Sequence, residues 1–522
     1  MKTVRDVVRD LMRDWKLTTI FGNPGSTELT FLADFPDDFR YVLGLQESSV
    51  VAMADAFAQQ SGNAAIVNLH SAGGLGHGLG SLVTAFHNRA PLIVLAGQQS
   101  RSLLPGDPYL GAIEPAEFPK PYVKWSYQPA RAQDVPAAFA QAYRLATQAP
   151  MGPVYLSVPF DDWNEPAEPV AALPRIASFA PDADALATVA AALDASERPA
   201  LVVGAAVDAD GAVPEAVALA EKTRAAVWAA PFSARCSFPE DHPQFAGFLP
   251  PARAGVAGLL EPYDCVVVLG APVFTYHVVA GGGPELPPLY VLSDDSQLLA
   301  RARATGVLTT QRLGIGGLTE LVSGTERPAP APRQLPPRLA DPAAGEQLSG
   351  AFVYQTISDL LPEGALVVEE APTNRPDIQE RLPITAPGGF LTMASGVLGY
   401  GLPAAVGAAL AEPARPVIAV LGDGGSMYGI QALWTAAREQ TAVTFVILDN
   451  GEYGAVRKHA RRNNSGKVPG YELGGLDFCS LATGMGCDAH RVETADELRT
   501  ALRSALAATV PTLLHVTISP AA

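Results

Sequence analysis

Short runs of apolar, often β-branched residues alternate with alanine-rich stretches along the whole chain. The runs include AAIVNLHS (64–71), PLIVLAGQQ (91–99), VYLSVPF (154–160), PALVVGAAV (199–207), CVVVLGAPV (265–273), VIAVLGDG (417–424) and TFVILDN (444–450). Such continuous runs predict strands that are buried on both faces, as in parallel sheets covered by helices. The alanine-rich stretches between them predict those helices. The pattern therefore predicts an α/β protein.

Two segments rich in proline and alanine interrupt this alternation, at residues 161–184 and 324–345. Neither has hydrophobic periodicity, so both are predicted to be surface linkers. A chain of 522 residues is also too long for a single core. We therefore expect three doubly wound parallel-sheet domains, over residues 1–180, 185–325 and 345–522.

Charge and composition narrow the classes of partner. The formal net charge is −17, which argues against nucleic acid or an anionic membrane as a partner.

The N-terminus carries charges every few residues, and no run of about 18 apolar residues occurs. We therefore expect neither a signal peptide nor a membrane span. The four cysteines show no CxxC spacing, which is typical of reduced thiols in a cytoplasmic protein.

Two predicted strands of the C-terminal segment end in polar residues. One ends in Asp423 between two glycines, and the other, after residues 425–448, ends in Asn450. Neighbouring parallel strands bring their carboxyl ends together at one edge of a sheet, where such sheets bind ligands. Carboxylate and amide oxygens suit Mg²⁺. By itself Gly-Asp-Gly is a common turn, but the second strand end at this spacing favours a metal site.

Backbone groups beside Asp423 add a binding site for phosphate. The residues Gly422, Gly424, Gly425 and Ser426 surround the predicted start of a helix. Free N–H groups at a helix start bind phosphate well. The two strand ends together resemble the thiamine diphosphate (ThDP) motif, Gly-Asp-Gly followed some two dozen residues later by Asn-Asn.

This resemblance implies ThDP as cofactor and Mg²⁺ (or Ca²⁺) as its metal. The metal ligands would be Asp423, Asn450 and the main-chain oxygen of Glu452. Asp449 stands where the motif has its first asparagine. Tyr453, Thr373 and Leu398 carry over as cofactor contacts, although simple core packing would also explain Leu398.

The resemblance covers nearly the whole chain. FGNPGSTELTFLADFPDDFRYVLGLQE, VNLHSAGG, GPVYLSVPFDDW, LGYGLPAAVGAALAEP and NGEYGAVR resemble the benzoylformate decarboxylases in order and spacing. These belong to the ThDP-dependent 2-keto acid decarboxylase/acetolactate synthase-like family. The three segments would then be a pyrimidine-binding, a central dinucleotide-like and a diphosphate-binding domain. No GxGxxG follows a strand in the central segment, so we expect no FAD.

The family also implies the catalytic groups. Glu47 in LGLQE would face N1′ of the aminopyrimidine and so promote removal of the thiazolium C2 proton. A glutamate at a helix start is also explained by the helix dipole alone. Ser26, His70 and His277 would surround the thiazolium, the serine orienting the substrate carboxylate and the histidines transferring protons. Any single histidine is usually structural, but three polar groups at three family positions favour catalysis.

The predicted substrate pocket departs from the family. His459 stands where the family has a large aromatic residue, and Pro372 where it has threonine; Ala455 and Val456 lie nearby. Small pocket changes alter substrate discrimination by roughly 10- to 200-fold. An aromatic 2-keto acid such as benzoylformate is our first expectation, and an aliphatic or polar one stays open. His77 has no histidine counterpart in the family, and we assign it little functional weight.

The predicted activity is non-oxidative decarboxylation of a 2-keto acid to an aldehyde and CO₂. Glu47 and the metal site lie in different domains, and the family builds each active site from two subunits. We therefore expect a homo-oligomer, with a dimer as minimum and a tetramer as the expected form. One alternative is a ThDP-dependent carboligase. Another is a non-catalytic scaffold, against which the presence of both Glu47 and Asp423 speaks.

Overall fold

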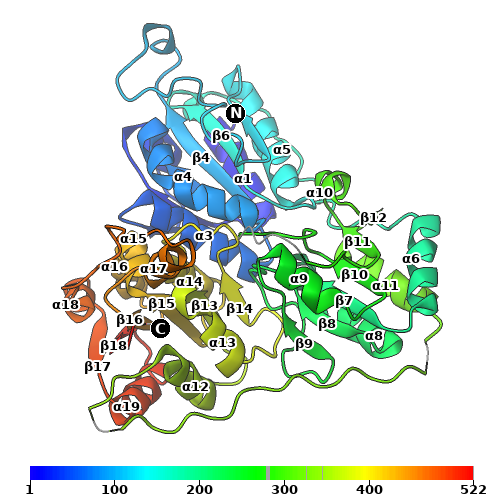
Figure 1. The fold of residues 1–522 in the computed structure, drawn as a ribbon. Helices are drawn as coiled ribbons and strands as arrows, with labels where there is room; N and C mark the ends of the chain where they lie inside the picture. The colour runs from blue at the N-terminus through cyan, green and yellow to red at the C-terminus, as the bar shows by residue number, and fades with distance from the viewer. Residues whose placement is uncertain (278–282, 325, 344, 521–522) are drawn as a thin grey trace. The chain divides into compact units, whose positions relative to one another are not determined.

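Three six-stranded parallel sheets make up the framework of the protein (Figure 1). The computed structural model describes residues 1–277, 283–324, 326–343 and 345–520. One sheet lies in each of the three predicted segments, with helices between its strands. The predicted α/β fold with three doubly wound parallel sheets is therefore confirmed.

The N-terminal sheet has the strand order β2-β1-β3-β4-β6-β5. Its strands are β1 (Thr19–Asn23), β2 (Arg40–Leu43), β3 (Ala65–Leu69), β4 (Leu92–Gln98), β5 (Trp125–Tyr127) and β6 (Val154–Pro159). Its helices are α1 (Val4–Asp14), η1 (Ser26–Glu28), α2 (Leu29–Leu32), α3 (Glu47–Ser61), α4 (Ser71–His87), η2 (Leu104–Gly106), η3 (Ala132–Asp134), α5 (Val135–Thr147) and η4 (Asp162–Asn164). The strand order reverses between β1 and β3, and such switch points are where ligands bind.

The C-terminal sheet has the order β14-β13-β15-β16-β18-β17. Its strands are β13 (Leu366–Glu370), β14 (Phe390–Thr392), β15 (Val417–Gly422), β16 (Val443–Asp449), β17 (Asp488–Val492) and β18 (Thr512–Thr517). Its helices are α12 (Gly350–Leu360), η5 (Pro372–Asn374), α13 (Arg375–Arg381), α14 (Gly401–Ala411), α15 (Asp423–Gly429), α16 (Ala432–Glu439), α17 (Gly454–Arg462), α18 (Phe478–Gly484) and α19 (Ala495–Leu506). Here the switch point lies between β13 and β15.

The central sheet has the order β12-β11-β10-β7-β8-β9. Its strands are β7 (Pro199–Val203), β8 (Ala226–Ala229), β9 (Phe245–Phe248), β10 (Cys265–Leu269), β11 (Leu289–Ser293) and β12 (Thr305–Leu308). Its helices are α6 (Ala183–Ala195), α7 (Ala205–Ala209), α8 (Val213–Thr223), α9 (Arg253–Leu260), α10 (Ser296–Arg301) and α11 (Gln311–Leu321). Every residue of the inner strands β7 and β10 is buried, as their continuous apolar runs predict.

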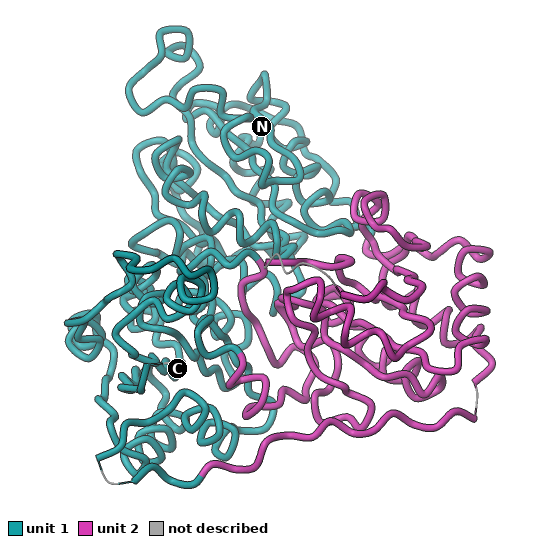
Figure 2. Tube along the Cα trace, viewed as in Figure 1, with its two compact units in different colours: residues 1–176, 340–375, 395–522 teal, residues 177–339, 376–394 magenta. Residues whose placement is uncertain are grey.

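The contacts divide the chain into two compact units (Figure 2). The first holds residues 1–176, 340–375 and 395–522, and the second holds residues 177–339 and 376–394. Within the first unit, α3 packs against α14 so closely that a Cβ on Gly407 would lie 1.9 Å from the carbonyl oxygen of Met53. Tyr400 beside α14 also donates a hydrogen bond to Asp55 of α3 at 3.2 Å. The first unit therefore joins the N-terminal sheet to the C-terminal sheet except for β14, which belongs to the second unit.

Two general features bear on the environment of the chain. Among the described residues, no helix combines the length and the apolar character needed to cross a bilayer. All four cysteines are free thiols, and Cys236, Cys265 and Cys487 are buried. Burial raises the pKa of each of these three thiols, which keeps them protonated and weakly reactive.

Candidate active site

Ser26 and His70 lie at the switch point of the N-terminal sheet. Ser26 opens η1 shortly after β1 ends, and His70 follows the last residue of β3. Gly25 packs against the imidazole, since a Cβ on Gly25 would lie 2.3 Å from Cγ and Nδ1 of His70. The turn that carries Ser26 is thus held against the histidine. Ser26 is exposed and His70 is half-buried, so both are reachable for a small molecule.

A buried carboxylate, Glu28, lies beside His70. Its side chain is 1% exposed, and its Oε2 lies 2.9 Å from Nδ1 of His70. Three further donors bind it: the N–H groups of Gly25 and Gly97, at 2.8 and 2.9 Å, and the hydroxyl of Thr27, at 2.7 Å. The sequence analysis missed Glu28. The available signal was a glutamate three residues after the glycine that precedes a helical turn, as in a capping box.

Glu47 is the first residue of α3 and is only 8% exposed. Asn23 donates to its Oε1 at 3.2 Å, and Nδ1 of His77 lies 3.1 Å from its Oε2. Gly74 of α4 lies beside this carboxylate, since a Cβ on Gly74 would be in van der Waals contact with Oε1 of Glu47, at 3.5 Å. The sequence analysis gave His77 little weight, whereas the structure places it directly on the predicted activating glutamate.

Asp423 begins α15 at the end of β15 and is 4% exposed. Its Oδ1 accepts a hydrogen bond from the N–H of Gly424 at 2.7 Å. Its buried Oδ2 has no hydrogen-bond partner among the described residues. Burial raises the pKa of Asp423, and the neighbouring Asp449 carboxylate raises it further. A buried carboxylate oxygen without a donor fits a divalent cation, which would supply the missing charge.

The predicted ligands Asn450 and Glu452 lie in the loop after β16. Oδ1 of Asn450 accepts a hydrogen bond from the N–H of Glu452 at 3.1 Å. The Glu452 side chain pairs with Arg457 at 2.8 Å, and its main-chain oxygen accepts a hydrogen bond from the N–H of Gly454 at 2.9 Å. Thr373, after β13, is close by, because a Cβ on Gly454 would lie 2.7 Å from Thr373 Cγ2 and 3.3 Å from Asn450 Nδ2. Residues that follow the ends of β13 and β16 therefore meet here.

Asp449 replaces the first asparagine of the motif and has its own buried partner. Its Oδ2 lies 2.7 Å from Nε2 of His515, a fully buried histidine on β18. Its Oδ1 accepts the N–H of Gly451 at 3.0 Å, which holds the turn that follows. Burial raises the pKa of Asp449, but the contacts with His515 and Gly451 outweigh it and lower the pKa overall. The sequence analysis did not find His515.

The glycines around Asp423 make room for their neighbours. A Cβ on Gly424 would lie 2.2 Å from the Tyr453 ring, and one on Gly425 would lie 2.9 Å from Oε1 of Glu370. The Ser426 hydroxyl donates to the carbonyl oxygen of Gly422 at 2.8 Å. The Tyr453 ring thus packs against the turn at Gly424, while the Ser426 hydroxyl turns back toward β15.

The loop that carries Leu398 is fastened by a second buried carboxylate. Glu370, at the end of β13, is 1% exposed and accepts the N–H groups of Gly399 and Gly401, each at 2.6 Å. Burial raises the pKa of Glu370 to about 7, although these N–H groups act in the opposite direction. Leu398 itself is half-buried. Glu370 was also missed by the sequence analysis.

The predicted pocket residues lie on α17 and η5. Ala455 and His459 are half-buried, and Val456 and Pro372 are exposed. α17 and η5 adjoin where Lys458 Nζ approaches the carbonyl oxygen of Thr373 at 3.5 Å. His277 belongs to the second compact unit, where its N–H donates to the carbonyl oxygen of Pro251 at 2.9 Å.

Comparisons with known proteins agree with these features. Family models of thiamine pyrophosphate enzymes match residues 2–117 (N-terminal TPP binding domain), 186–292 (central domain) and 376–516 (C-terminal TPP binding domain). A benzoylformate decarboxylase of Pseudomonas aeruginosa is 44% identical, with 100% of both chains covered.

Solved structures give the same result. A benzoylformate decarboxylase from Polynucleobacter necessarius has a TM-score of 0.97 at 39% identity, covering 100% of this chain and 99% of that one. A 4-hydroxybenzoylformate decarboxylase from Rhodococcus jostii RHA1 has a TM-score of 0.95 at 40% identity, covering 99% of both. The chain therefore belongs to the thiamine diphosphate-dependent enzymes, in the branch that holds the benzoylformate decarboxylases.

Proposed function

We propose that this protein is a carboxy-lyase that converts a 2-keto acid, most suitably an aromatic one such as benzoylformate, to an aldehyde and CO₂. The observation that carries this proposal is that the turn bearing Ser26 packs, through Gly25, against the His70 ring at the switch point of the N-terminal sheet. A hydroxyl and an imidazole are the groups needed to orient a carboxylate and to move a proton. The similarity to decarboxylases over the full length supports the same activity.

Asp423, Asn450 and the main-chain oxygen of Glu452 would hold Mg²⁺ (or Ca²⁺) against the diphosphate. The unpartnered Oδ2 of Asp423 supports this assignment. The backbone of Gly424, Gly425 and Ser426 would bind phosphate oxygens, with Gly422 completing the turn. Thr373, Tyr453 and Leu398 would contact the rest of the cofactor. ThDP supplies, when bound, a nucleophilic carbon and an electron sink for the carbanion.

The side chains of the N-terminal segment act on the substrate and on the aminopyrimidine. Glu47 would exchange a proton with N1′, and its burial against α4 excludes water from that contact. Ser26 would orient the substrate carboxylate, and His70 would present a ring nitrogen to the carbonyl oxygen. His277 would add a second acid. The half-buried His459, together with Pro372, Ala455 and Val456, would select the side group of the substrate.

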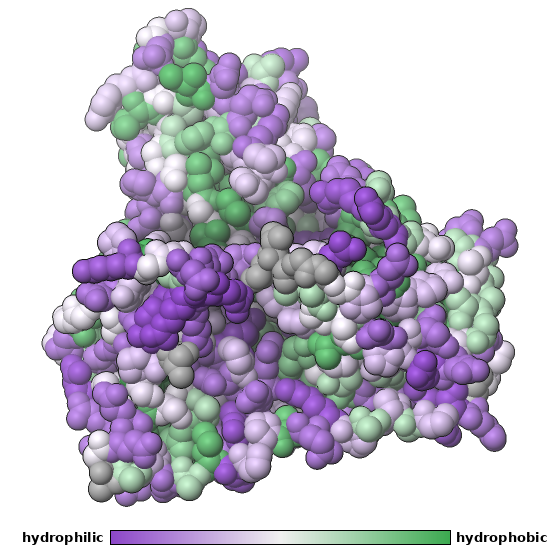
Figure 3. Space-filling model, viewed as in Figure 1, coloured by the Kyte–Doolittle hydropathy of each residue, from purple (hydrophilic) through white to green (hydrophobic). Residues whose placement is uncertain are grey.

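A homo-oligomer is part of the proposal, with a dimer as minimum and a tetramer as the expected form. Segment 103–122 supports it, because it exposes large apolar side chains that a second copy would cover. These are Leu103, Tyr109, Leu110, Ile113, Phe118 and Tyr122. Figure 3 shows hydrophobic residues gathered on the surface of the N-terminal segment. The segments 1–180, 185–325 and 345–522 would act as pyrimidine-binding, central and diphosphate-binding domains in the cytoplasm.

The test is CO₂ release from a panel of 2-keto acids with ThDP and Mg²⁺ supplied. The panel holds benzoylformate, 4-hydroxybenzoylformate, pyruvate and a branched aliphatic keto acid. Each assay is run with and without added aldehyde, and the products are identified by chromatography. The free aldehyde from an aromatic keto acid is the expected main product. No CO₂ from any keto acid would disprove the proposal, and a ligated ketone as main product would assign a carboligase instead.

A further inference from the structure

We propose that Glu28 is a positioning residue that fixes the orientation and the tautomer of His70. This inference rests on the proposed function only in that His70 is taken to meet the substrate. The sequence pattern implies His70 but not Glu28. Their contact is made by the fold, because Glu28 comes from η1 after β1 and His70 from the end of β3.

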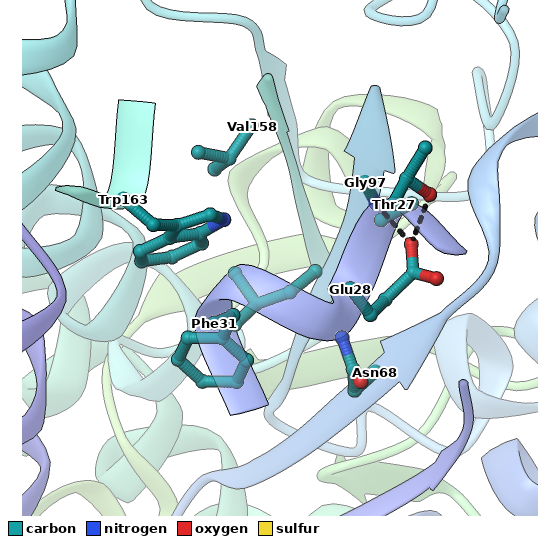
Figure 4. Close-up of a pocket in the computed structure, with 9 residues that line it drawn as sticks. Thr27, Glu28, Phe31, Asn68, Gly97, Val158 and Trp163 are labelled. Atoms are coloured by element: carbon teal, nitrogen blue, oxygen red, sulfur yellow. Dashed lines mark hydrogen bonds between the residues drawn. The ribbon is translucent and has the colours of Figure 1, made fainter. Parts of the chain in front are cut away.

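The Glu28 carboxylate is surrounded by donors. Its Oε1 accepts the N–H of Gly97 at 2.9 Å and the Thr27 hydroxyl at 2.7 Å (Figure 4). Its Oε2 accepts the N–H of Gly25 at 2.8 Å and lies 2.9 Å from Nδ1 of His70. With its side chain 1% exposed, the carboxylate is held on both oxygens in one orientation.

This arrangement decides which nitrogen of His70 carries a proton. An ionised carboxylate only accepts hydrogen bonds, so the nitrogen that faces it, Nδ1, must be the donor. The neutral ring then keeps its lone pair on Nε2, and the charged ring has its transferable proton there. Nε2 is thus the nitrogen available to the substrate. The second contact of Nδ1, at 3.1 Å to the Thr27 hydroxyl, is compatible because that hydroxyl gives its own hydrogen to Glu28.

Two glycines leave the space that the His70 ring and the Glu28 carboxylate occupy. A Cβ on Gly25 would lie 2.3 Å from the His70 ring, and one on Gly97 would lie 2.3 Å from Oε1 of Glu28. Any side chain at either position would displace the ring or the carboxylate. The backbone therefore leaves room for this pair and for little else.

The test is a double-mutant cycle on the full-length enzyme with ThDP and Mg²⁺. The variants are Glu28→Gln, His70→Ala and the combination of the two. Glutamine has the size of glutamate, but its NH₂ group is a donor and would face Nδ1 of His70. Nδ1 would then have to accept a hydrogen bond, so the neutral ring would carry its proton on Nε2 instead. We expect Glu28→Gln to lower kcat about 10- to 100-fold, the loss seen for partners that orient metal-binding histidines. In the His70→Ala background the same change should alter kcat less than about twofold, because coupled residues are not additive.

A readout independent of activity follows the tautomer directly. Diethyl pyrocarbonate modifies a ring nitrogen that has a free lone pair, and mass spectrometry of peptides measures its rate at each histidine. We expect slower modification of His70 in Glu28→Gln, relative to the exposed His490 as internal reference. The rate would respond in this way even if the substrate were not a 2-keto acid. A failure of the proposed function is thereby distinguishable from a failure of this inference.

The control is Asp162→Asn, which alters another buried carboxylate of the N-terminal segment, one that lies in η4 and pairs with Arg101 at 2.6 Å. It should lower the melting temperature without slowing the modification of His70. If Glu28→Gln does not fold, Thr27→Val removes one donor from the carboxylate and should give a smaller loss that again depends on His70. Equal losses of kcat with and without His70, or an unchanged modification rate, would overturn the proposal.

Discussion

Replacing Glu47 with glutamine separates the chemical role of this side chain from its structural one. The substitution keeps the size of the side chain and removes its charge. Oε1 of the new amide would still accept the hydrogen bond that Asn23 donates to Oε1 of Glu47 at 3.2 Å. Its NH₂ group would face Nδ1 of His77, which accepts a hydrogen bond in the neutral ring. Since both contacts have a substitute, we expect the free energy of unfolding to change by less than about 1 kcal/mol.

The effect on catalysis should be much larger. A positioned acid–base group contributes about 10²- to 10⁴-fold to a rate, or roughly 3–5 kcal/mol of barrier. Glutamine does not exchange a proton with N1′, so this contribution should be lost in full. Glu47→Gln should therefore bind ThDP with near-unchanged affinity and show a kcat lower by that factor.

Three measurements check this prediction. Aldehyde release gives kcat, titration calorimetry gives the affinity for ThDP with Mg²⁺, and thermal unfolding gives stability. Glu165→Gln, the same chemical change at an exposed position of the same segment, serves as control and should match the wild type in all three. A kcat within tenfold of the wild type in a Glu47→Gln enzyme saturated with ThDP would refute the assigned role.

Three other predictions concern the metal, the pH and the packing. Loss of a residue that only orients a metal ligand lowers metal affinity by up to about 100-fold, so Asp423→Ala, which removes a ligand itself, should weaken Mg²⁺-dependent ThDP binding by more than that. Titration calorimetry that shows wild-type ThDP uptake would contradict this prediction. Because the folded-state pKa of Glu370 is about 7, above its ordinary value of 4.5, its stabilising contribution is present at low pH and lost as pH rises through this window. The melting temperature of the wild type minus that of Glu370→Gln should therefore fall between about pH 5 and 7.5; a difference that stays constant would refute this. Gly407→Ala places a Cβ 1.9 Å from the Met53 carbonyl oxygen, so it should cost about 3 kcal/mol of stability, and an unchanged melting temperature would count against the packing argument.

Several parts of the site could be predicted because their signals are local. A buried parallel strand needs a continuous apolar run, and the turn after it needs small or polar residues, so the places of Asp423 and Asn450 follow from neighbouring letters alone. Ser26 and His70 were found in the same way, through segments that resemble a known family. The structure packs Gly25, the neighbour of Ser26, against the His70 ring, and it places Thr373 and Asn450 beside the same glycine, Gly454.

The groups that support these residues could not be predicted. Glu28, Glu370 and His515 are buried polar side chains whose partners lie far along the chain or on other strands. The spacing of Glu28 from Gly25 indicates a capping box, but the adjoining sequence does not show that Glu28 is buried or that it also receives the N–H of Gly97. His77 was undervalued for a related reason, because its contact with Glu47 depends on how closely α4 approaches α3.

The sequence by itself determined the α/β class, the three parallel sheets and the residue types offered at the strand ends, since each depends on the order of apolar and polar residues over a few positions. Only the tertiary structure decided which carboxylates are buried and which N–H groups donate hydrogen bonds to them. It also decided which ring nitrogen of His70 is available to the substrate. Those outcomes depend on distances between segments that are remote in sequence, and hydrogen bonds are lost when such distances change by about an ångström.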